Sequence, residues 1–83
     1  MASRVYKLVT KIPARGQMGA VNTVDTDTIT EEDGGVRVTT RVTGTVEGTP
    51  VDRRSSRFYP GVTLEAASNY RRKHGYVLLS SIP

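Results

Sequence analysis

The sequence contains no cysteine and no tryptophan, and only one phenylalanine and one histidine among its 83 residues. The absence of cysteine excludes disulfides, thiol nucleophiles and Cys-ligated zinc, and it suits a reducing compartment. Long apolar runs are also lacking: none approaches the roughly 20 residues that span a bilayer, and the first residues lack the apolar core of a signal peptide. We therefore expect a soluble, cytoplasmic protein without a membrane partner.

Large apolar residues are sparse but regularly placed. Leu, Ile, Val and Phe together account for 19 of the 83 residues, close to the level at which low hydrophobicity favours disorder. A chain of this length forms one hydrophobic core and has little apolar surface to bury in it. We predict a single small domain over residues 1–83, for which a partner or self-association would add stability.

The net charge of +4 is unevenly distributed along the chain. Residues 1–17 carry four basic and no acidic side chains, residues 18–50 carry a net charge of −4, and residues 51–83 carry +4. Two basic ends separated by an acidic middle predict a polarised surface if the ends meet in space.

Alternation of apolar and polar residues, which is typical of half-buried strands, recurs in three segments. These segments are residues 4–12, 20–30 and 36–46, of which the last has the clearest pattern. The intervening residues 31–35 (EEDGG), and residues 47–50 (EGTP) after the third segment, are rich in residues that form tight turns. Gly44 interrupts the apolar face of the third strand and indicates a bulge or a close approach by another group.

The C-terminal third predicts a strand or loop, then a helix, then a final strand. Residues 51–59 have basic side chains on both faces, as in an edge strand or an ordered loop. Thr63 is placed to cap a helix that continues to about His74 and ends before Gly75. Residues 75–82 (GYVLLSSI) are apolar and are predicted to form a central strand. The expected fold is α+β: a mostly antiparallel sheet of four or five strands, in the order β-β-β-(β)-α-β, with one helix packed on one face.

Residue patterns for catalysis or metal binding are weak. His74 has no acidic partner near it in the sequence, so a capping or surface role is favoured over a general base. The acidic run from Asp25 to Asp33 lacks the ligand spacing of a calcium loop, and the PARGQMG segment lacks the lysine of a phosphate-binding loop. The serine pairs have no recognisable base. We predict a protein that is not an enzyme and that holds no metal or cofactor.

One cluster of residue types supports a hypothesis about binding. Basic and aromatic side chains are interleaved in two C-terminal segments, namely Arg53, Arg54, Arg57, Phe58, Tyr59, Tyr70, Arg71, Arg72 and Lys73. Arginines pair with carboxylates or phosphates, and aromatic rings fill pockets on proteins or stack on bases. The simpler interpretation is a solvated basic surface that keeps a small protein soluble. No recognised nucleic-acid-binding motif accompanies the cluster.

The segment RRSSRFYPGVTLEAASNYRRKHGYVLLSSIP resembles the small phycobilisome linker domain, in which a strand ends near a proline, a basic helix follows and a glycine leads into a final strand. The opening RVYKLV also resembles the first strand of that family, whereas the acidic, threonine-rich residues 22–50 depart from it. The resemblance implies a basic, non-enzymatic protein that binds inside a larger assembly.

These patterns lead to two expectations about function. The first is a non-catalytic accessory or structural protein that docks on a larger protein or assembly, with an acidic surface, through its basic face or an exposed strand edge. The second is a nucleic-acid-binding domain whose basic C-terminal half contacts phosphates and whose affinity falls steeply with salt. Formation of a homo-oligomer is compatible with both.

Overall fold

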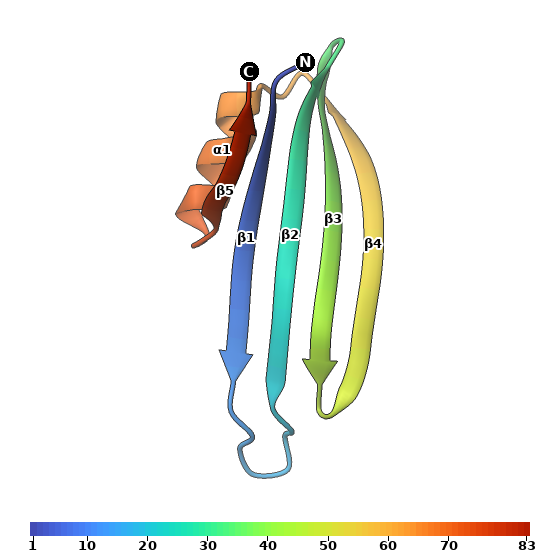
Figure 1. The fold of residues 1–83 in the computed structure, drawn as a ribbon, viewed down its shortest axis with the longest axis vertical. Helices are drawn as coiled ribbons and strands as arrows, with labels where there is room; N and C mark the ends of the chain where they lie inside the picture. Colours follow the sequence, from blue (N-terminus) through green and yellow to red (C-terminus); the bar gives the residue numbers. More distant parts are fainter.

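The computed structural model describes residues 1–83, which form one five-stranded sheet and one helix (Figure 1). The elements are β1 (Ser3–Ile12), β2 (Val21–Glu32), β3 (Gly35–Val46), β4 (Thr49–Pro60), α1 (Leu64–Lys73) and β5 (Val77–Ile82). Neighbouring strands are antiparallel, and their order in the sheet is β4-β3-β2-β1-β5. Because 65% of the residues are in strands and 12% in the helix, the predicted α+β class describes the protein only coarsely. The protein is mostly β.

The predicted strands and helix are present, with small shifts at their ends. Residues 51–59, for which strand and loop were both open, lie within β4 at one edge of the sheet. The prediction that residues 75–82 form a central strand is wrong, because β5 is the opposite edge strand and pairs only with β1. Only three residues connect α1 to β5. The chain therefore re-enters the sheet beside β1, whose other side is already occupied by β2.

Two glycines allow the long β2–β3–β4 ribbon to form. Glu47 and Gly48 connect β3 to β4 with φ angles of 52° and 79°, as in the two-residue type I′ turn that matches the twist of a hairpin. Gly44, with φ 134°, lies where a Cβ would overlap the backbone oxygen of Asn22 on β2. The register between β2 and β3 continues through this point, so Gly44 marks a close approach and not a bulge.

Helix α1 begins and ends where its capping residues predict. The Thr63 hydroxyl accepts a hydrogen bond from the backbone N–H of Ala66 at 3.1 Å, which satisfies one of the free donors of the first turn. At the other end Gly75 takes φ 87°, and the N–H of Tyr76 donates to the backbone oxygen of Arg71 at 3.0 Å. This arrangement is a Schellman cap, and it turns the chain into β5.

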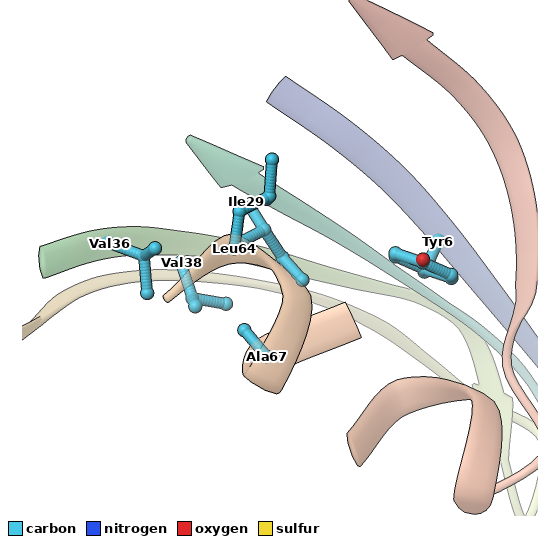
Figure 2. Close-up of a cluster of buried hydrophobic side chains, with 6 residues drawn as sticks. All are labelled: Tyr6, Ile29, Val36, Val38, Leu64 and Ala67. Atoms are coloured by element: carbon cyan, nitrogen blue, oxygen red, sulfur yellow. The ribbon is translucent and has the colours of Figure 1, made fainter. Parts of the chain in front are cut away.

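The hydrophobic core lies between α1 and one end of the sheet. Its members are Tyr6, Ile29, Val36, Val38, Leu64 and Ala67. Figure 2 shows the side chains of β2 and β3 gathered around the two helix residues, with Tyr6 apart from them on β1. We call the side of the sheet that faces α1 the helix side, and the other side the open face.

The helix covers only part of the helix side. Ten helical residues extend over about 15 Å, whereas twelve strand residues extend over about 40 Å. The rest of the helix side, which is the lower half of the sheet in Figure 1, is not covered by a helix. The molecule is elongated and measures 47 × 21 × 19 Å. Only eight of the 83 residues are buried. The core is therefore small for the length of the strands. No helix in the structure is of a length and apolarity that would cross a membrane.

Candidate functional site

A groove of about 520 Å³ runs between α1 and the β3–β4 edge of the sheet. We call it the α1–β4 groove. Its lining is Val36, Val38, Tyr59, Val62, Ala66, Ala67, Tyr70 and Arg71. The two valines come from β3, Ala67 comes from the buried face of α1, and Ala66 is the exposed residue beside it. The groove is thus a continuation of the core that no side chain of this protein fills.

Tyr59, Tyr70 and Arg71 form the rim of the groove, and Arg57 lies next to the rim, over the Tyr59 ring. Tyr59 and Tyr70 are 37% and 58% exposed, and each lies within 5.3 Å of an arginine guanidinium, Arg57 and Arg71 respectively. Contacts of this type stabilise a cation over an aromatic ring. Arg71 forms an ion pair, whereas Arg57 has no acidic group within ion-pair distance. Arg57 is therefore the uncompensated positive charge at the rim.

Three of the nine predicted binding residues, Tyr59, Tyr70 and Arg71, line this groove, and a fourth, Arg57, lies beside it over the Tyr59 ring. The pairing of Val38 with Arg57 and of Val36 with Tyr59 places both β4 side chains on the helix side. Tyr70 and Arg71 reach the same groove from α1. These residues of segments 53–59 and 70–73, which the sequence analysis grouped together, therefore lie near one another in the structure.

The other five predicted residues lie elsewhere. Arg54 and Phe58 are on the open face, where the Arg37 guanidinium lies 5.8 Å from the Phe58 ring. Arg53 is on the helix side, where it pairs with Val42, but it does not line the groove. Arg72 and Lys73 are exposed in the last helical turn and take no part in the groove. The basic residues of the C-terminal half consequently do not form one continuous surface.

A buried ion pair holds the helix to the sheet directly beneath the groove. Arg71 Nε donates to Asp27 Oδ2 at 2.7 Å, and the side chains of the two residues are only 14% and 5% exposed. Both charges are removed from water, so each depends on the other for compensation. The pairing neutralises Arg71 and fixes the position of the last turn of α1 over β2.

A second carboxylate lies beside this ion pair without a cation of its own. Asp25 is two residues before Asp27 on β2, on the same side of the sheet. Burial and the neighbouring Asp27 carboxylate raise the pKa of Asp25 to about 6. Tyr76, next to them, has its pKa raised to about 12 by burial and by the two carboxylates. One oxygen of each aspartate has no hydrogen-bond partner.

Sequence reasoning missed this buried polar cluster, although the pattern contained a signal for it. Asp25, Asp27 and Ile29 share one side of β2 because strand residues alternate, and Ile29 belongs to the core. The acidic run is tested in the sequence analysis only against the ligand spacing of a calcium loop. Period-two alternation applied to the charged residues would have placed both aspartates under the helix.

The remaining chemical candidates are dispersed. His74 caps the C-terminus of α1 and lies against Tyr70, with 4.3 Å between ring centroids and the rings tilted by 47°. In residues 1–83 the structure gathers no three His, Asp or Glu side chains in a way that would hold a metal ion. Ser55 is on β4 and Ser80 is on β5, at opposite edges of the sheet.

Comparisons with protein-family models, with curated proteins and with solved structures found no match to this chain. Any statement about its function consequently depends on the geometry of the α1–β4 groove and of the surfaces around it.

Proposed function

We propose that this protein is a non-enzymatic binding protein that docks on a larger protein through the α1–β4 groove, which receives an apolar segment flanked by acidic residues. The observation that carries the proposal is the groove itself, a 520 Å³ extension of the core lined mainly by valine, alanine and tyrosine. Apolar grooves with aromatic and arginine side chains at their margins are typical of sites that bind protein segments.

Charge favours an acidic partner segment. Three arginines of β4, namely Arg53, Arg54 and Arg57, make no ion pair within the protein. Arg57 lies over the Tyr59 ring at the groove, where a partner carboxylate would meet both an unpaired guanidinium and an apolar floor. Complementary charge of this kind sets the rate of association and the orientation of the partner more than the total affinity.

The distribution of the basic residues favours a protein partner over nucleic acid. A duplex or single strand is held by several cations along one surface. Here Arg54 is on the open face, Arg57 is on the helix side, and Arg71 is already neutralised by Asp27. The nucleic-acid alternative would engage only a fraction of the predicted cations at once. The phycobilisome-linker-like alternative, a docking protein of a particular assembly, rests on the sequence resemblance alone.

The proposal can be tested with a short fluorescent peptide in which leucines are flanked by glutamates. We expect saturable binding measured by fluorescence anisotropy, with little binding of the matched peptide in which lysine replaces each glutamate. Arg57→Glu should weaken binding about fivefold or more, because it reverses the charge at the rim.

Arg54→Glu is the matched control, since it makes the same charge change on the same strand but on the open face. It should leave the affinity for the peptide within about twofold of the original, because long-range surface charge is screened at physiological salt. Equal loss in both variants, or a preference of the protein for a labelled oligonucleotide over the acidic peptide, would contradict the proposal.

A further inference from the structure

The edge strand β5 is exposed, apolar and unpartnered along one side. It lies at the border of the sheet, beside β1 (Figure 1). It hydrogen-bonds to β1 through one edge, and no strand pairs with the backbone donors and acceptors of its other edge. All six residues are exposed, and Val77, Leu78, Leu79 and Ile82 are between 45% and 64% accessible. Leu78 pairs with Tyr6 on the helix side, whereas Val77 and Ile82 pair with residues of the open face. Apolar surface is therefore exposed on both faces of this edge.

The two edges of the sheet differ in how they resist pairing with another chain. Edge strands are usually protected by charged residues, proline or bulges that discourage association. The β4 edge has three arginines and an aspartate, with Pro50 near one end and Pro60 at the other. The sequence of β5, VLLSSI, has no charge and no proline. The β5 strand does contain a bulge at Leu79, where its register with β1 shifts. Of the two edges it is still the less protected against an incoming strand, because it lacks charge and proline.

The accessible surface of the chain is larger than that expected of a folded monomer of its mass. A folded monomer of 9.1 kDa is expected to expose about 4,900 Å². This chain exposes 5742 Å², so the excess is about 800 Å². The excess is spread over the elongated molecule, and the exposed apolar residues of β5 contribute to it.

We infer that β5 pairs with β5 of a second copy of this chain, antiparallel, so that the two sheets join into one continuous sheet. A two-fold axis perpendicular to the sheet relates the copies and places both helices on the same face. Because β5 has no charged residue, no like charges meet within the paired strands. Pairing β5 with the β4 edge of another copy would instead give an open-ended assembly, and the charged β4 edge opposes it.

Self-pairing is independent of the α1–β4 groove. The groove involves β3 and β4 at one border of the sheet, whereas β5 forms the other border. A dimer would therefore present two grooves, one toward each end of the joined sheet. Such a protein would hold two acidic segments at once, which raises its avidity for an assembly with repeated binding sites.

The test is the mass of the protein in solution, measured by sedimentation equilibrium over a range of concentrations. We expect twice the chain mass of 9.1 kDa. Leu79→Lys places a cation in the middle of the exposed strand and should give the mass of a single chain. Ser55→Lys makes a matched change in the middle of the exposed β4 edge and should leave the dimer intact.

Hydrogen exchange provides a second measurement that remains informative if a variant is poorly folded. In the unmodified protein the outward amides of β5 should be protected, and dilution to the monomer should remove that protection while the amides between β2 and β3 stay protected. A wild-type chain that stays monomeric at high concentration would overturn the inference. Equal dissociation by Ser55→Lys, or growth of species larger than a dimer, would also do so.

Discussion

At the scale of single residues, the buried polar cluster under α1 has one cation for two carboxylates. Arg71 bonds Asp27, and Asp25 lies beside the pair with no cation of its own. Burial of a charge is costly unless a partner compensates for it. Asp25 responds by retaining its proton to higher pH, with a pKa raised to about 6 from the ordinary 3.8. The cluster therefore links the stability of the folded protein to pH.

Replacing Asp25 by asparagine should change how the stability depends on pH. The folded protein holds the Asp25 proton more tightly than the unfolded chain does, so this group favours folding below about pH 4, and that contribution is lost as the pH rises toward about 6. The Asp25→Asn variant has no proton to lose. It should be more stable than the original at about pH 7.5 and should lose less stability between about pH 4.5 and about pH 7.5.

Urea unfolding of both proteins at the two pH values measures this difference. The Asp25→Asn substitution keeps the size of the side chain, so cavity effects are small, and only the titration is removed. If the variant were less stable than the original at the higher pH, Asp25 would be acting as a stabilising anion, and the description of the cluster would be wrong.

At the scale of the elements, α1 is a short helix that depends on its caps. Ten residues are fewer than the number at which isolated helices become stable in water, so the capping bonds and the packing of Leu64 and Ala67 hold it together. Thr63→Ala removes the acceptor for the Ala66 N–H. It should lower the free energy of unfolding by about 1 kcal/mol, within a range of roughly 0.5–2.

Thr63→Ser is the control for this change, because serine provides the same hydroxyl and should restore most of the stability. Equilibrium unfolding followed by circular dichroism compares the three proteins. An alanine variant as stable as the original, with the serine variant unchanged, would show that the hydroxyl bond to Ala66 has no energetic role in forming the helix.

The elements differ in how fully local sequence specifies them. Strand β3 and the ends of α1 were predictable because alternation, Thr63 and Gly75 act over a few residues. The position of β5 was not predictable from its apolar run, since a run such as VLLSSI is equally typical of a covered central strand and of an edge strand that awaits a partner. Its place depends on the short link from α1 and on the prior pairing of β1 with β2.

The candidate site was predictable only in part, for a related reason. Residue types identified basic and aromatic segments, but which of these side chains meet depends on strand parity and on the turn of the helix. Arg54 and Arg57 lie on opposite faces because their positions on the strand differ by an odd number. The Arg71 side chain turns from α1 toward the sheet because its partner, Asp27, is buried on β2, 44 residues away in sequence. Neither fact is visible in composition.

At the scale of the whole molecule, the sheet is much longer than the layer that covers it. Few residues are buried, and the helix lies over one end of strands that extend along a 47 Å molecule. Small domains without disulfides commonly obtain additional stability from association. Both proposals assign a partner to apolar surface that the chain does not cover itself: a partner segment in the groove and a second copy on β5.

The most direct test of the central proposal is to locate a bound segment on the molecule. The methyl groups of Val62 and Ala66 and the rings of Tyr59 and Tyr70 belong to the accessible lining of the α1–β4 groove. NMR would detect intermolecular contacts between them and the leucines of the acidic peptide used above. We expect such contacts in the groove, with the peptide glutamates near Arg57. Contacts confined to the open face, or to the half of the sheet beyond the helix, would contradict the proposal.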